Sequence, residues 1–268
     1  MDIKKIIMLW VVSFLVMAAI VIYQRVTGPT YPITAKIEIN SQSYKFSLPR
    51  THPGEGDQII SLAIPDKSVK GKFISKRFKS NDEWQTVSMV RNHENLEASI
   101  PHQPTAGKII YQIILESNGR EFSLTQEPVI IRFNSGVPTI VLILHLFFLF
   151  ASLTLSMRTG FEVIFKGNKV LLYAFLTVIS LFIGGLIIGP IMQKFAFDAY
   201  WTGWPLGHDL TDNKTLVAFL FWLLALWRLK VNPEKPIWAI VAMVVTLIVF
   251  LIPHSVLGSE LDYSKMPR

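Results

Sequence analysis

Long apolar stretches alternate with polar segments along this chain, and their lengths predict membrane-spanning helices. A span needs about 20 mainly apolar residues to cross about 30 Å of hydrocarbon. The fourth apolar run is short. A helix of full length that ends at Arg228 would begin near Asp209. The polar residues between Asp209 and the apolar run would then lie in the outer part of the bilayer. The runs that predict five spans are residues 6–23, 137–157, 170–192, 216–227 and 236–252.

The first apolar run has the features of an export signal. Lys4 and Lys5 precede residues 6–23, as in the charged and apolar regions of a signal peptide. The run continues without a break to Tyr23, which favours an uncleaved signal-anchor helix. With either interpretation, the residues that follow are exported.

The distribution of Lys and Arg predicts the orientation of the five spans, because cytoplasmic connections are enriched in these residues. We therefore expect a cytoplasmic N-terminus, an exported segment 24–137 and an extracytoplasmic C-terminal tail, in a bacterial inner membrane. The basic residues on the predicted cytoplasmic side are Lys4, Lys5, Arg158, Lys166, Lys169, Arg228, Lys230 and Lys235.

The exported segment reads as short strands separated by turns. Apolar and polar residues alternate over 33–39, which is the period of a half-buried strand. Asn118-Gly119 lies between two such runs and predicts a hairpin, since a type I′ turn needs positive φ at both central residues. Residues 129–133 form a last strand before the second span. We expect seven to nine strands in an antiparallel β-sandwich.

This strand pattern resembles immunoglobulin-like or fibronectin type III modules at the level of the fold. The segment has no cysteine pair and no motif that identifies one family. The expected fold class is thus an α+β membrane protein, with a five-helix transmembrane bundle and the sandwich inserted between its first two helices. The expected domains are a signal-anchor (1–23), the exported sandwich (24–137), and a four-helix transmembrane domain (138–268) with an outer loop (193–214) and an outer tail (254–268).

Composition narrows the class of protein further. The chain has 268 residues, 51% of them apolar, 17% charged, no cysteine and a formal net charge of +7. These values exclude a disordered chain, a collagen, a disulfide-stapled module and a purely soluble enzyme. Six basic residues between 67 and 79 predict either a contact with anionic lipid or an acidic partner, or a solvated hairpin. An exported domain makes nucleic acid an improbable partner.

Most of the unusual polar and aromatic residues are predicted to lie at the outer membrane face. One interpretation is a shared binding or catalytic site, because ionisable groups at membrane depth are costly and mostly functional. The structural alternative is an aromatic belt with a helix cap, in which Asp209 or Thr211 caps the fourth span and Lys214 reaches outward. The candidate residues are Asp198, Tyr200, Trp201, Trp204, His208, Asp209, Asp212, Lys214, Glu260 and Asp262.

Three histidines share the predicted outer half of the protein. His145, His208 and His254 could hold a divalent metal ion or a haem, because neutral imidazole is the commonest metal ligand. The alternative is that each is a packed or interfacial residue. Nearby, Gly185 and Gly189 have the small-xxx-small spacing of close helix contacts, which predicts tight packing or a break in the third span.

The sequence contains no nucleophile elbow, HExxH motif or P-loop. We therefore expect a non-catalytic scaffold, assembly factor or accessory subunit of a membrane complex, with residues 24–137 binding a membrane or periplasmic protein. The first alternative is a haem- or metal-binding membrane oxidoreductase subunit. The second is a membrane enzyme or transporter for a lipid or small solute.

Overall fold

The computed structural model describes residues 1–253, 258 and 260–265, and the chain forms two compact units. The helical unit comprises Met1–Pro29 and Val137–Gly258, and the β unit comprises Thr30–Gly136 and Ser259–Arg268. The sequence pattern groups residues 260–265 with the helices, whereas in the structure they pack on the β unit. The protein is thus a mixed α+β chain.

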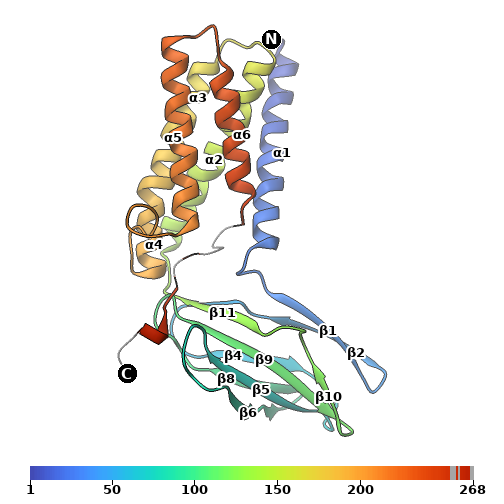
Figure 1. Cartoon of the computed structure of the whole chain (residues 1–268). Coiled ribbons are helices and arrows are strands. Elements are labelled where there is room, and N and C mark those ends of the chain that lie inside the picture. The colour runs from blue at the N-terminus through green and yellow to red at the C-terminus, as the bar shows by residue number, and fades with distance from the viewer. Residues whose placement is uncertain (254–257, 259, 266–268) are drawn as a thin grey trace. The chain divides into compact units, whose positions relative to one another are not determined.

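The helical unit contains five long helical segments over the described residues (Figure 1). The third segment is continuous through α3, a π-helix and α4. By length and composition, α1, α2 and this third segment could each cross a membrane, and α6 is a shorter apolar helix. The bounds are α1 (Ile3–Thr27), α2 (Thr139–Ile164), α3 (Val170–Leu181), η1 (Phe182–Ile188), α4 (Gly189–Phe197), α5 (Leu210–Val231) and α6 (Ile237–Leu251).

Helix α2 contacts α1, α3 and α6, and α5 packs against α3 and α6. Trp222 of α5 is fully buried, and its indole N–H donates a hydrogen bond to Thr246 Oγ1 of α6 at 2.8 Å. The same core contains Leu181 and Met157 from α3 and α2. Because α5 contributes a buried tryptophan to this core, it belongs to the bundle despite its polar start.

The β unit contains eleven strands over the described residues, more than the seven to nine expected, because several additional strands are only three or four residues long. The strands are β1 (Ile33–Ile39), β2 (Gln42–Leu48), β3 (Thr51–Pro53), β4 (Gln58–Ala63), β5 (Lys70–Arg77), β6 (Gln85–Ser88), β7 (Val90–Asn92), β8 (Asn95–Ile100), β9 (Lys108–Ser117), β10 (Arg120–Ser123) and β11 (Val129–Asn134).

The strands form a β1–β2 pair, a β4–β8–β7 sheet and a larger sheet in the order β3–β11–β9–β5–β6, with β10 also paired to β9 (Figure 1). All pairs are antiparallel except β3 with β11. The predicted hairpin is confirmed: Arg120 pairs with Ser117, and Asn118 and Gly119 have φ values of 51° and 72°. A single apolar cluster includes residues of all three sheets.

Candidate functional sites

The loop between α4 and α5 is held by one carboxylate. Asp212 Oδ2 accepts hydrogen bonds from the backbone N–H groups of Thr202 and Gly203, at 2.8 and 2.9 Å. It also accepts one from Gln193 Nε2 at 3.2 Å. A Cβ atom at residue 203 would lie 2.6 Å from the Asp212 Cβ, so glycine is needed for this approach. Asp212, the most conspicuous ionisable candidate, therefore orders the chain around it.

The neighbouring polar residues also bind the chain itself. Asp209 is the N-cap of α5, since its Oδ1 accepts from the N–H of Thr211 at 2.8 Å. Asn213 Oδ1 accepts from the N–H of Trp204 at 2.6 Å. Lys214 is buried, and its Nζ donates to the Ile252 carbonyl at 2.8 Å. Of the alternatives derived from the sequence, the cap at Asp209 is the one observed, while Lys214 binds a carbonyl of the bundle.

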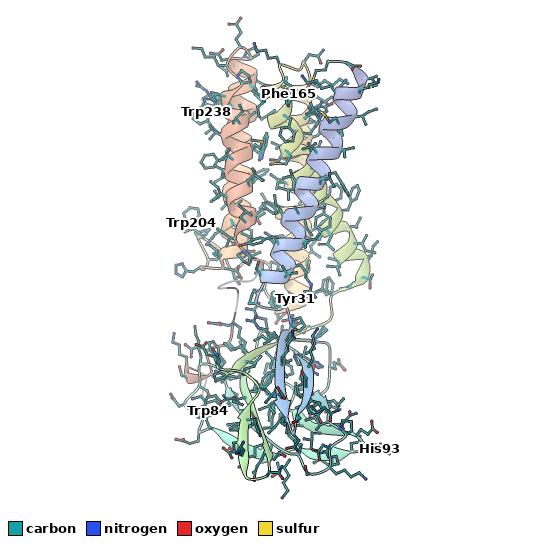
Figure 2. The ribbon with its side chains drawn as sticks, turned by 90° about the vertical axis from the view of Figure 1, so that its right-hand side faces the viewer. Tyr31, Trp84, His93, Phe165, Trp204 and Trp238 are labelled. Carbon is teal, nitrogen blue, oxygen red and sulfur yellow. The ribbon has the colours of Figure 1, made fainter. Side chains whose placement is uncertain are left out.

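The aromatic candidates lie at the surface of this loop. Trp204 and Tyr200 are 67% and 61% exposed, and Leu206 is 79% exposed. Figure 2 shows Trp204 near one end of the helical unit and Trp238 near the other. Asp198 is also exposed and forms an ion pair with Lys194 at 2.6 Å. The indole of Trp201, which is partly exposed, donates to the Trp204 carbonyl at 3.1 Å. Tyr200, Trp204 and Asp198 therefore present exposed side chains on this loop.

Two of the three candidate metal-binding histidines, His145 and His208, lie in the part of the chain that the structure describes. His145 of α2 is buried, and its Nδ1 lies 2.9 Å from the Gly184 carbonyl. His208 is exposed in the loop, and His254 lies outside the described residues. Among residues 1–253, 258 and 260–265, no group of three His, Asp or Glu side chains is arranged to hold a metal ion.

The glycine-rich part of the third helix is a π-helix, η1 (Phe182–Ile188). The Gly184 carbonyl accepts the N–H of Gly189, five residues on, and also faces the His145 ring. A Cβ atom on Gly184 would lie 2.7 Å from Phe148, and one on Gly185 would lie 2.6 Å from Thr215. Of the two alternatives for this segment, tight packing is the one observed, while the helix continues from Val170 to Phe197 with π-helical hydrogen bonding at the glycines. Such π-helical turns occur frequently at functional sites.

A buried ion pair in α2 is a feature that the sequence pattern did not predict. Helix α2 continues to Ile164, so Arg158 lies within this helix instead of in the connection after it. Its NH1 atom lies 2.5 Å from Glu162 Oε2, and both side chains are 1% exposed. The guanidinium also lies over the rings of Tyr173 and Trp10, at 4.8 and 5.6 Å. The i,i+4 spacing of Arg158 and Glu162 was the available signal.

Glu162 also orders the turn that follows α2. Its Oε1 accepts the backbone N–H of Lys169 at 3.0 Å, and its main-chain carbonyl accepts that of Gly167 at 2.7 Å. A Cβ atom at residue 167 would lie 2.1 Å from the carboxylate. One buried carboxylate thus pairs a cation and fixes the connection between two helices.

In the β unit, the last described residues dock onto the strands and the loop before β9. Glu260 forms ion pairs with both Lys79 and Lys108. Leu261 N–H donates to the Ala106 carbonyl at 3.2 Å, and Ser264 N–H donates to the Lys79 carbonyl at 3.0 Å. Asp262, in contrast, binds Ser264 and Lys265 within the described part of this segment. Glu260 therefore serves docking in the β unit, while Asp262 orders the docked segment itself.

Tyr263 is the buried anchor of the docked segment. Its hydroxyl donates to Gln103 Oε1 at 3.0 Å, and the Arg77 guanidinium lies 4.8 Å from its ring centre. A Cβ atom on Gly107 would lie 2.4 Å from the Tyr263 hydroxyl, so this glycine makes room for the phenol. Burial raises the pKa of Tyr263, which keeps the hydroxyl protonated as a donor.

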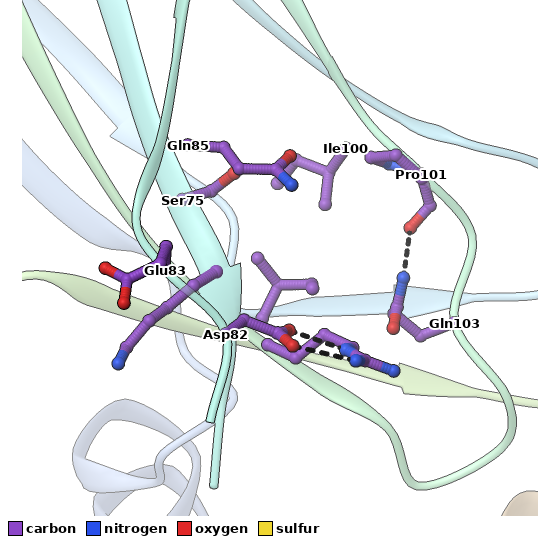
Figure 3. Close-up of a pocket in the computed structure, with 10 residues that line it drawn as sticks. Ser75, Asp82, Glu83, Gln85, Ile100, Pro101 and Gln103 are labelled. Carbon is purple, nitrogen blue, oxygen red and sulfur yellow. Dashed lines mark hydrogen bonds and ion pairs between the residues drawn. The ribbon is translucent and has the colours of Figure 1, made fainter. Parts of the chain in front are cut away.

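A cavity of about 320 Å³ adjoins this anchor, since Arg77 and Gln103 contact Tyr263 and also line the cavity. Figure 3 shows Gln103 on one side of it, and Asp82 on another. Asp82 accepts two hydrogen bonds from Arg77, at 2.6 and 2.8 Å, which hold the pKa of this carboxyl at about 2. The cavity therefore presents charges of both signs beside an apolar wall formed by Ile100 and Ile109.

Docking of the segment is expected to weaken in acid. Burial alone would raise the pKa of Glu260, but the ammonium groups of Lys108 and Lys79 outweigh this and hold it below its ordinary value of 4.5. A lowered carboxyl pKa stabilises the docked state above pH 4.5, and this contribution is lost as the pH falls through the lowered pKa. The chain has no cysteine, so a spin label on Lys265→Cys, whose lysine side chain is 82% exposed, can report docking.

The label is expected to be immobilised at pH 7 and mobile in acid. Glu260→Gln is expected to be mobile already at pH 7, because the neutral amide loses both ion pairs. Any pH dependence that this variant keeps reports the other carboxyls with lowered pKa values near the segment. These are Asp262, which accepts hydrogen bonds from Ser264, and Asp82, which holds Arg77 over the Tyr263 ring. Equal label mobility in the two proteins at pH 7 would show that Glu260 does not hold the segment.

Comparisons with protein-family models, with curated proteins and with solved structures found no match to this chain. Three clusters therefore carry the functional interpretation. The Asp212 cluster orders a loop that exposes aromatic side chains, the Arg158–Glu162 pair joins helices, and the β unit binds an extended segment of the chain. Each of these arrangements positions or binds polypeptide.

Proposed function

We propose that this chain is an integral membrane scaffold, assembly factor or accessory subunit, whose exported β unit binds another protein. The observation that carries the proposal is the role of Asp212. Its carboxylate, the strongest candidate for chemistry in the helical unit, binds two backbone N–H groups and an amide of its own chain. A carboxylate engaged in this way orders a surface loop, which is typical of a binding protein.

The β unit supports the same proposal through its architecture. The apolar cluster shared by the sheets includes Phe46 of β2, Leu62 of β4 and Phe133 of β11. Sheets that enclose one core in this way favour a sandwich of the immunoglobulin-like or fibronectin type III kind. Modules of this architecture mostly bind or position other molecules.

Contacts at one end of the helical unit support the five-span topology. Gln24, near the end of α1, donates to the carbonyls of Phe250 and Ile252 at the end of α6. Lys214, at the start of α5, donates to the same Ile252 carbonyl. The end of α1 that leads to the β unit thus lies beside the end of α6 and the start of α5, as alternating crossings require.

The docked segment supports this topology independently. The chain leaves the β unit before α2 and returns to it at Glu260, which pairs with Lys79 and Lys108. A chain that returns to the same side of a membrane crosses it an even number of times, as four crossings after α1 would do. The proposed location is a bacterial inner membrane with the β unit outside. A membrane-impermeant maleimide should then label Lys45→Cys and Lys265→Cys in intact cells, and Lys166→Cys only after permeabilisation.

Purification in mild detergent tests the proposed function directly. We expect a membrane or periplasmic protein to co-purify in a fixed ratio. Trp204→Ala with Leu206→Ala is expected to reduce that ratio if the loop takes part in the contact, and Asp198→Ala is the matched exposed control from the same loop. Recovery of the chain alone, in a form that turns over a lipid or small solute, would contradict the proposal.

His145 favours a second candidate function, a haem- or metal-binding subunit. Its Nδ1 atom faces the Gly184 carbonyl, an arrangement that leaves Nε2 as the ligating nitrogen. The π-helix beside it is a further feature of functional sites. The same purified protein would then show a Soret band or a bound metal by elemental analysis, and His145→Ala would abolish the signal.

A further inference from the structure

The docked C-terminal segment makes the kinds of contact by which proteins recognise extended peptides. The main-chain bonds from Leu261 and Ser264 do not depend on side-chain identity. Selectivity comes from two side chains, the Glu260 carboxylate between Lys79 and Lys108, and the buried Tyr263. We call the surface that receives them, formed by Arg77, Lys79, Gln103, Ala106, Gly107 and Lys108, the tail groove.

The tail groove contains a pocket that is complementary to the tyrosine side chain in shape and in hydrogen bonding. Gly107 leaves room that a Cβ atom would fill, Gln103 supplies the acceptor for the hydroxyl, and Arg77 lies over the ring. Arg77 is fixed in turn by two hydrogen bonds to Asp82. A preorganised pocket of this kind costs little conformational entropy when a ligand enters it.

The groove also extends beyond the contacts of the described residues 260–265. The cavity of about 320 Å³ shares Arg77 and Gln103 with the Tyr263 contacts and continues to Ser75, Gln85 and Pro101 (Figure 3). Its wall carries basic, acidic and amide side chains together with apolar ones. Such a lining complements the mixed donors, acceptors and side chains of a polypeptide, and the cavity offers space beside the described residues 260–265.

The docked segment makes a small contact with the tail groove, which favours its displacement by another segment. Over residues 260–265, only Tyr263 is buried, while Glu260, Leu261 and Asp262 are partly exposed. The covalent linkage adds to these contacts, since a short flexible tether gives an effective concentration in the millimolar range. A partner fixed in the same membrane is concentrated in a comparable way.

We propose that the tail groove is a binding site for an extended segment of a partner protein, with a carboxylate three residues before a tyrosine. Residues Glu260–Tyr263 occupy the site in cis until such a segment displaces them. This inference rests on the proposed function, because it specifies how the β unit binds its partner. The two lysines select the carboxylate, and the Gly107 pocket selects the tyrosine.

The test uses the full chain in detergent and a fluorescent peptide, SELDYSK, that copies residues 259–265. A variant with Glu260→Ala and Tyr263→Ala empties the groove, and we expect it to bind the peptide at least about tenfold more tightly than the wild-type chain, measured by fluorescence anisotropy. A peptide with alanine at the same two positions should not bind. In the emptied protein, Lys79→Glu should abolish binding, whereas Lys67→Glu, at an exposed position, should leave it unchanged.

A second measurement does not depend on the emptied variant. Excess SELDYSK peptide should mobilise the spin label on Lys265→Cys in a chain that is otherwise wild type, by displacing the docked segment. No binding to the emptied protein, together with no mobilisation of the label, would show that the segment is a fixed tether and would overturn the inference. Binding of the alanine peptide would overturn its selectivity. Neither result affects co-purification of a partner, which tests the proposed function separately.

Discussion

Replacing Arg158 by methionine is expected to destabilise the helical unit by about 3–5 kcal/mol, because it leaves Glu162 as an uncompensated buried charge. The methionine preserves much of the side-chain volume, so the loss reports the charge rather than a cavity. The variant also loses the contacts of the guanidinium with Tyr173 and Trp10. Unfolding of the purified protein by denaturant in detergent micelles measures the change.

The chain offers a matched control for this variant. Lys194 and Asp198 form an ion pair with the same i,i+4 spacing, but their side chains are 41% and 81% exposed. Lys194→Met is expected to change stability by less than about 1 kcal/mol, because exposed pairs contribute little. The double change Arg158→Met with Glu162→Met should recover most of the loss. Equal effects of Arg158→Met and Lys194→Met would show that the buried pair contributes no more than an exposed one.

Replacing Asp212 by leucine is expected to release the loop between α4 and α5 while leaving membrane insertion intact. The N–H groups of Thr202 and Gly203 lose their acceptor, and each such loss costs about 1–3 kcal/mol where the donor is shielded from water. Amide hydrogen exchange over residues 198–209 should therefore accelerate by at least about tenfold. Function, measured by complementation or by co-purification of the proposed partner, should fall with it.

Two further variants show whether the effect of Asp212→Leu comes from losing the order of the loop or from losing a negative charge. Asp212→Asn keeps one oxygen in nearly the same place and is expected to retain most of the protection from exchange. Asp198→Leu removes an exposed carboxylate from the same loop and should leave exchange at Thr202 and Gly203 unchanged. If Asp212→Leu behaved like the wild-type chain in both assays, the carboxylate would have no role beyond its place in the first turn of α5.

Local features of the chain were predictable because their causes lie within a few residues. Asn118 and Gly119 formed the predicted two-residue turn, since both adopt the positive φ that this turn needs. Asp209 caps α5 at the position where a helix of full length was expected to begin. The apolar runs became helices α1, α2 and the continuous helix over Val170–Phe197, all long enough to cross a membrane.

Pairings between distant residues were not predictable in the same way. Arg158 was interpreted as a basic residue of a connection, because its burial depends on Trp10 and Tyr173 from two other helices. Glu260 was grouped with the helical domain, whereas its carboxylate binds Lys79 and Lys108 of the β unit. No spacing along the chain encodes a contact across more than a hundred residues.

The order of amino acids predicted the apolar helices, the strands between the first two of them, and the turn and cap that depend on near neighbours. It did so because hydrophobic periodicity and backbone preference act over one element at a time. The roles of the polar residues became apparent only in the folded chain. A buried charge is costly unless it has partners, and the fold brought Asp212 to a loop backbone, Arg158 to Glu162 and an aromatic pair, and Glu260 to two lysines of the β unit.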